Sequence, residues 1–182
     1  MALLLFSSES LRTPRFATRS SILTAPPLYT ATDDYLDRLL GGKGLSEEEC
    51  ARIAEFAAEQ REFMEEWLKE GSVYDEIAEV SREEFEKHPI SLSLSSMFFE
   101  RDVRYTYAEY LEHVALEREY AWKHANYSCK ANPHQAFRNI QIIIREGNGV
   151  LVSKSNSPAI HFVIRHPKMC SAIENMVVPV VE

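Results

Sequence analysis

Two cysteines and two histidines have the spacing of zinc ligands. Four residues separate Cys129 from His134, and three residues separate His166 from Cys170. Thiolate sulfur and imidazole nitrogen are the ligands of tetrahedral zinc sites. The two pairs flank a segment that is predicted to form three short strands, so they would lie at opposite ends of a sheet. Seven strand residues span roughly 23 Å at ~3.3 Å each, beyond the reach of shared ligands, so no metal site is predicted.

Cys129 also has the companions of a thiol protease nearby in the sequence. His124 and His134 flank it, and Asn132 lies three residues after it. Enzymes of that kind gather cysteine and histidine from distant segments, so nearness along the chain is not evidence for them. We therefore assign no catalytic residue, and a Cys- or His-dependent enzyme stands only as an alternative.

No sequence motif points to a cofactor. The glycine-rich sequence at 41–46 lacks the spacing of a phosphate-binding loop and follows no predicted strand. The serines within 91–95 lie in no G-x-S-x-G sequence. The glutamates of 46–70 are expected to form a solvated acidic face, because nothing pairs them with histidine or removes them from water. No cofactor is predicted.

Residues 137–176 determine the expected architecture. Within them, the segments 137–146, 150–155 and 159–165 alternate in period two and are rich in β-branched residues, as half-buried strands are. The short turns between these segments, one Gly-rich and one containing Pro158, predict an antiparallel meander. Pro167 suits the first turn of a C-terminal helix. Alternation at 90–95 makes that segment a candidate fourth strand at the sheet edge.

The two faces of this meander differ in polarity. One face is almost wholly apolar and must be covered, and it carries Ile140, Ile142, Ile144, Val150, Val152, Ile160, Phe162 and Ile164. The other face is mixed and mildly basic, and it carries Gln141, Ile143, Arg145, Leu151, Ser153, His161, Val163 and Arg165. We expect four members of the mixed face to bind a partner protein: Gln141, Arg145, His161 and Arg165. The alternative is a solvated face, or one half-covered by another helix.

Helices are predicted before this sheet. Capping residues and apolar spacing indicate helices at 32–40 and 46–70, shorter ones beginning at Ser72 and Ser81, and a long one over 107–127. One side of the long helix is predicted to carry an apolar and aromatic stripe: Tyr107, Tyr110, Leu111, Val114, Ala121, Trp122 and Ala125. Such a stripe favours a core position, although tyrosine and tryptophan also dominate binding interfaces.

Composition places the chain among globular proteins, and the predicted helices and strands indicate the α+β class. The length of 182 residues predicts a single domain over 32–182. In this domain a helical N-terminal half packs on the meander, and a C-terminal helix follows. Residues 32–100 hold 19 acidic against 7 basic side chains, whereas 101–182 hold 10 basic against 8 acidic. The acidic half disfavours wrapping by nucleic acid. No run of 18 apolar residues is present, so no membrane-spanning helix is expected.

Residues 1–31 are predicted to be a flexible arm or a targeting segment. They are rich in serine and threonine and contain Arg12, Arg15 and Arg19 with a single acid, as organelle transit peptides do. A secretion leader has a similar composition. Three widely spaced cysteines argue against a disulfide framework, so an intracellular, reducing compartment is expected.

The sequence favours a non-enzymatic adaptor or regulatory protein that acts by binding another protein. The mixed sheet face and the Tyr/Trp-rich helix are the candidate surfaces. The first alternative is a nucleic-acid-binding protein that uses the basic residues of 101–182, although that face lacks the exposed aromatic side chains that stack bases.

Overall fold

The fold is known from a computed structural model that describes residues 15–21, 25–78, 80–92, 103–132, 140–145, 149–154 and 160–177. Its centre is a six-stranded mixed sheet of order β3-β2-β1-β4-β5-β6. The strands are β1 Arg15–Ser21, β2 Ser72–Ala78, β3 Tyr127–Asn132, β4 Ile140–Arg145, β5 Gly149–Lys154 and β6 Ile160–Ile164. Strands β1, β2 and β3 run parallel to one another, whereas β4, β5 and β6 form an antiparallel meander that joins β1 through β4.

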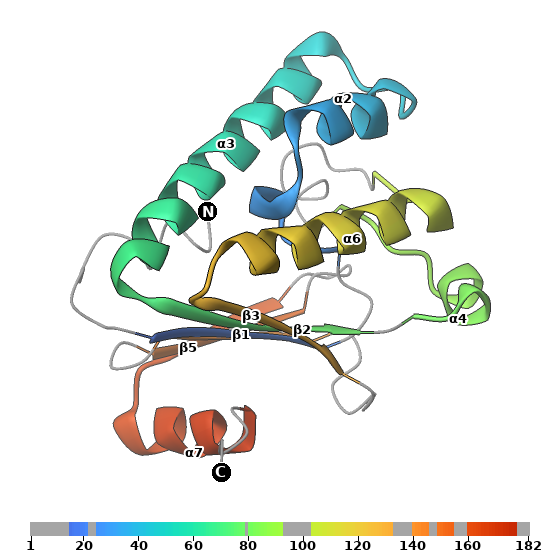
Figure 1. The fold of residues 1–182 in the computed structure, drawn as a ribbon. Coiled ribbons are helices and arrows are strands. Elements are labelled where there is room, and N and C mark those ends of the chain that lie inside the picture. The colour runs from blue at the N-terminus through green and yellow to red at the C-terminus, as the bar shows by residue number, and fades with distance from the viewer. Residues whose placement is uncertain are drawn as a thin grey trace.

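Helices cover the two faces of the sheet unequally. They are the 3₁₀ helix η1 Leu28–Thr30 and the α-helices α2 Asp33–Gly41, α3 Glu47–Glu70, α4 Arg82–Lys87, α6 Tyr107–Lys123 and α7 Pro167–Val177. Helices α2, α3 and α6 lie on one side of the sheet, and α7 lies on the other (Figure 1). None of the helices in the described ranges is long and apolar enough to cross a membrane.

The predicted α+β class is confirmed, with its helical N-terminal half, its antiparallel meander and its C-terminal helix. The parallel half of the sheet was not predicted. A helix was expected to begin at Ser72, but this segment is β2, because its pairing with β1 and β3 outweighs a local helix start. Of the candidate fourth strand at 90–95, the described residues form only an isolated bridge between Ser91 and Arg104, and 93–95 lie outside them.

The segment expected to be an arm contributes to the fold. Residues 15–21 form β1 between β2 and β4, and residues 28–31 are buried against the helical layer. The ring of Tyr29 lies edge-on to the ring of Tyr120, with 5.7 Å between the ring centroids. The Tyr29 hydroxyl lies 3.1 Å from the hydroxyl of Tyr127. The chain is therefore anchored to both α6 and β3 before α2 begins.

The two faces of the meander match the predicted sets. Register pairs Ile142 with Val152 and Val152 with Phe162, so the apolar residues share one face. On that face, buried side chains of β4 and β5 pack with Cys170 and Ile173 of α7. The mixed face is turned toward the helical layer, where a second cluster joins sheet and helices: Ile143, Leu151, Met64, Leu68, Tyr120 and Tyr127. Both faces of β4 and β5 are therefore covered.

Local capping explains where the helices begin. The predicted capping boxes at Ser46, Ser81 and Thr106 are all present, each with a glutamate three residues on. In each box a hydroxyl accepts from the backbone while the carboxylate accepts from the cap N–H, which satisfies two of the donors that a helix start leaves free. Helix α6 ends at Lys123, four residues earlier than predicted, and β3 begins at Tyr127.

Gly149 is where the meander depends on the absence of a side chain. Its φ is 150°, and a Cβ there would lie 2.7 Å from the carbonyl oxygen of Ile164 on β6. Gly44 also has positive φ, at 66°, but a Cβ there would meet nothing within 4 Å. A side chain at Gly44 would therefore cost backbone strain alone, whereas a side chain at Gly149 would cost backbone strain and a steric clash.

We expect Gly149→Ala to lower the free energy of unfolding by about 2–4 kcal/mol, because strain and displacement of β6 add together. The matched variant Gly44→Ala should cost only about 1 kcal/mol, from the left-handed backbone alone. Urea unfolding of both variants measures the difference. Equal losses in the two variants would contradict the close approach of β5 to β6.

Candidate functional site

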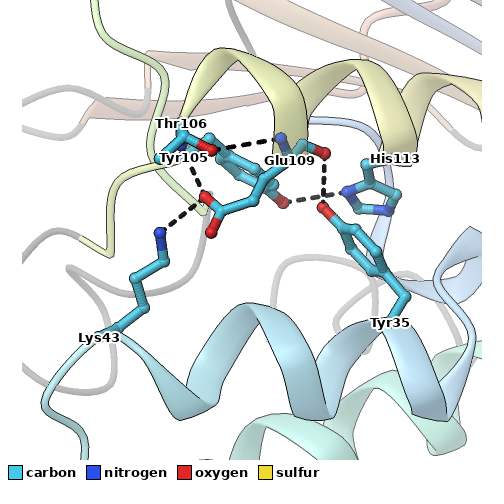
Figure 2. Close-up of polar contacts among 6 residues, drawn as sticks. All are labelled: Tyr35, Lys43, Tyr105, Thr106, Glu109 and His113. Carbon is cyan, nitrogen blue, oxygen red and sulfur yellow. Dashed lines mark hydrogen bonds and ion pairs between the residues drawn. The ribbon is translucent and has the colours of Figure 1, made fainter.

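A buried histidine on α6 connects three separate segments of the chain. The His113 side chain is fully buried. Its Nδ1 lies 3.0 Å from the hydroxyl of Tyr105, and its Nε2 lies 3.3 Å from the hydroxyl of Thr30. The Thr30 hydroxyl in turn donates to the carbonyl of Pro27 at 2.7 Å. These contacts join η1, the segment before α6 and α6 itself, and Figure 2 shows the contact between His113 and Tyr105.

The partners of His113 determine where its proton lies. Because the Thr30 hydroxyl already donates to Pro27, it can only accept from the ring, so Nε2 carries the hydrogen. Nδ1 then accepts from the Tyr105 hydroxyl. Burial lowers the pKa of His113 to about 4, although a hydrogen bond to the Pro27 carbonyl acts in the opposite direction. The ring is therefore neutral at physiological pH, with one defined tautomer.

A second set of contacts orients the first turn of α6 against α2. The Tyr35 hydroxyl donates to the backbone carbonyl of Glu109 at 2.8 Å. The Glu109 carboxylate accepts from the Thr106 backbone at 2.6 Å and pairs with Lys43 at 2.7 Å (Figure 2). Partial burial would raise the pKa of Glu109, but the hydrogen bonds from Lys43 and Thr106 outweigh it and lower the pKa. The charged Glu109 carboxylate thus holds the start of α6 next to Lys43, which lies two residues after the end of α2.

These polar groups position α6 and offer little to a reactant. The His113 ring is closed to solvent and both of its nitrogens are bonded within the fold. Burial raises the pKa of the Tyr35 and Tyr105 hydroxyls far above the physiological range, so they stay protonated donors. The network can fix a helix orientation, whereas general acid–base chemistry would need a group that a substrate can reach.

The cysteines that suggested zinc or thiol chemistry lie apart. Cys129 on β3 packs within the helical layer, with its thiol 4.0 Å from a carboxylate oxygen of Glu117. Cys170 on α7 lies on the opposite face of the sheet, and its thiol donates to the Ile164 carbonyl at 3.3 Å. His134 falls outside the described residues. Within the described ranges, no group of three His, Cys, Asp or Glu side chains is placed to hold a metal ion.

The predicted partner-binding residues fall at two places. Gln141 and Arg145 lie at the two ends of β4, where only their backbone is described. His161 and Arg165 are exposed, and the His161 Nδ1 lies 3.0 Å from the hydroxyl of Ser153 on β5. The centre of the mixed face is closed, because Ile143, Leu151 and Ser153 are buried beneath the helices. Among the described side chains of the predicted surface, the open ones lie on β6 and at Arg165 directly after it.

Strand β6 also exposes apolar side chains that were expected to be covered. Phe162 is 60% exposed, and Ile160 on the same face is 43% exposed. Val163, which was placed on the mixed face, is 50% exposed. The register that places Phe162 beside Val152 was predictable, but the reach of α7 was not. The sequence contains one signal for the exposure of β6. The C-terminal helix α7 follows β6 directly, and a single helix can cover only a few neighbouring strands.

The long helix α6 is rotated from the predicted orientation. Tyr110 and Val114 of the predicted stripe are buried, but Trp122 is 94% exposed and Leu111 is 46% exposed. The residues that replace them inside are polar, namely His113 and Glu117. Hydrophobic periodicity therefore pointed to the wrong side, since it assigns histidine and glutamate to solvent.

Comparisons with known proteins give no guide to function. The sequence matches no family model and no curated protein, and the structure matches no solved structure. The function therefore has to be argued from these surfaces alone.

We expect His113 to make the protein less stable in mild acid. Its pKa in the folded state lies below 6.5, so the unfolded state binds more protons and stability is lost as pH falls from 6.5 towards 4. Across that window the loss amounts to about 3 kcal/mol. Glu109, whose pKa is lowered from 4.5, contributes stability that is lost as the pH falls below about 4.5.

The measurement is urea unfolding at a series of pH values for the wild type and His113→Gln. The variant should be less stable at pH 7 but should show a flatter profile between pH 6.5 and 4.5, because glutamine does not titrate. The exposed His88→Gln variant controls for the loss of a surface imidazole. An unchanged pH profile in His113→Gln would contradict the buried neutral ring.

Proposed function

We propose that the protein acts by binding another protein, and that the partner adds an extended segment to the outer edge of β6. The observation that carries this proposal is an edge strand with an exposed Phe162 at its centre. An edge strand presents unpaired backbone donors and acceptors to solvent, and added strands use them for main-chain hydrogen bonds.

The composition of β6 supports an edge that accepts a strand. Natural proteins protect exposed edges with lysine, proline or a bulge. The five residues of β6, IHFVI, contain none of these and carry no acid either. Among the described residues, no strand pairs with the outer side of β6. Aromatic side chains, phenylalanine included, are enriched at the centres of protein–protein interfaces.

The flanking residues indicate the chemistry of the partner segment. Apolar side chains beside Ile160 and Phe162 would be buried on the α7 side of the sheet. Arg165, exposed just after β6, favours an acidic residue at the adjoining end of the partner segment. We therefore expect an extended segment with apolar residues at alternate positions and one carboxylate beside Arg165. His161 and Val163 would meet its other face.

Selection of peptides against the immobilised protein tests the proposal. We expect selected peptides to carry this pattern, and to slow hydrogen exchange of the β6 amides when they bind. Phe162→Lys should weaken their affinity at least ~30-fold, because it removes a hot spot and places a charge on the edge. Met169→Lys, which charges an equally exposed apolar residue of α7, is the matched control.

The same peptides also distinguish the contribution of Arg165. Selection against Arg165→Glu should return peptides with a basic residue in place of the acidic one, since the charge opposite is reversed. Peptides that bind Phe162→Lys as tightly as the wild type, or that protect amides away from β6, would contradict the proposal. So would a selection that returns no peptide with alternating apolar residues.

A further inference from the structure

The solvent-facing side of α6 carries two large apolar side chains, Leu111 and Trp122. Helix α6 buries His113 and Glu117, yet leaves Leu111 and Trp122 exposed. The exposed positions follow a spacing of three and four residues, as one stripe along the helix: Ala108, Leu111, Ala115, Arg118 and Trp122. This is the 3-4 spacing by which one helix packs against another.

We propose that two copies of the chain associate through this stripe, with their α6 helices antiparallel and crossing at Ala115. A twofold axis through Ala115 pairs each residue with the one equally far on the other side of position 115 in the second copy. Trp122 then packs over Ala108 of the second copy, and Arg118 meets Glu112. A twofold-symmetric contact must be complementary to itself, and these pairs satisfy that condition in both size and charge.

The side-chain sizes fit a close approach of the two helices. Alanine at the crossing point keeps the axes near the short end of the usual distance of roughly 8–10 Å. The large Trp122 ring faces the small Ala108, so neither a clash nor a void arises at the ends of the contact. Burial of a tryptophan that is 94% exposed supplies the main apolar contribution.

The charges fit a second copy better than an unrelated partner. Glu112 already pairs with Arg38 of α2, and Arg118 of the second copy would extend this pair to two cations around one carboxylate. Glu119 pairs with Lys123 along the helix, which leaves its aliphatic stem beside Leu111 of the second copy. An antiparallel second copy of α6 places Arg118 opposite Glu112 and, at the same time, Trp122 opposite Ala108.

The dimer should be weak. Helix α6 has 17 residues and is about 26 Å long at 1.5 Å per residue. A single helix crossing of that length lies at the small end of specific interfaces, below about 1,200 Å² in total. We expect dissociation in the micromolar range, so that association depends on concentration.

Sedimentation equilibrium over micromolar to submillimolar concentrations tests the dimer. Trp122→Ala should weaken self-association at least ~30-fold, whereas Met169→Ala on the other side of the sheet should leave it unchanged. Both residues are exposed, so neither change should lower the melting temperature. A wild-type protein that stays monomeric throughout, or a dimer that persists in Trp122→Ala, would overturn the proposal.

Exchange of the paired charges provides the decisive control. Arg118→Glu and Glu112→Arg each bring like charges together in their own dimer, and each should weaken it at least ~10-fold. An equal mixture of the two variants should associate as well as the wild type, because both contacts then join opposite charges. Misfolding or contact through another surface cannot produce this rescue. A mixture that remains monomeric would overturn the antiparallel arrangement about Ala115.

Discussion

The hydrogen bonds of His113 determine which side of α6 faces the core. Three groups, the Tyr105 hydroxyl, the Thr30 hydroxyl and the Pro27 carbonyl, surround the ring and leave no freedom to rotate the helix. A turn of the helix toward its more apolar side would bury Leu111 and Trp122 but would leave the buried Tyr105 hydroxyl without its partner and separate the Thr30 hydroxyl from the His113 ring. Buried polar groups without partners cost about 1–3 kcal/mol each, which offsets much of the apolar gain. The exposed stripe of α6 is thus a consequence of the polar network beneath it.

A similar geometric limit explains the exposed edge at β6. A helix is about 10 Å across, and neighbouring strands lie about 4.8 Å apart, so one helix covers about two strands. On the α7 side of the sheet that helix packs over β4 and β5, where Val150 is fully buried. Nothing comparable lies over Phe162 among the described residues of that face. The opposite face carries α2, α3 and α6 (Figure 1), and buried side chains on that face extend as far as Leu151 of β5.

Local patterns in the sequence predicted the elements whose contacts are local. The meander, its two faces and the capped helices follow from alternation, turns and caps within a few residues of one another. Strands β1, β2 and β3 were missed because each pairs with a segment more than 50 residues away, through helical crossovers. Their sequences, such as RFATRSS in β1, lack the apolar alternation that marks the meander. The rotation of α6 was missed for a related reason, since Thr30 and Pro27 lie more than 80 residues from His113.

The distribution of polar and apolar groups supports the proposed role in binding another protein. His113 and the Tyr105 hydroxyl bonded to it are buried, whereas Trp122 and Phe162 are exposed. The two apolar surfaces lie far apart, because α6 packs beside β3 at one edge of the sheet and β6 forms the other. A partner strand at β6 would therefore leave α6 free to meet a second copy. A dimer of this kind would present two β6 edges, and two linked sites raise the apparent affinity for a partner with repeated segments. Weak self-association and edge-strand binding would then strengthen each other through geometry, without any contact between the two surfaces.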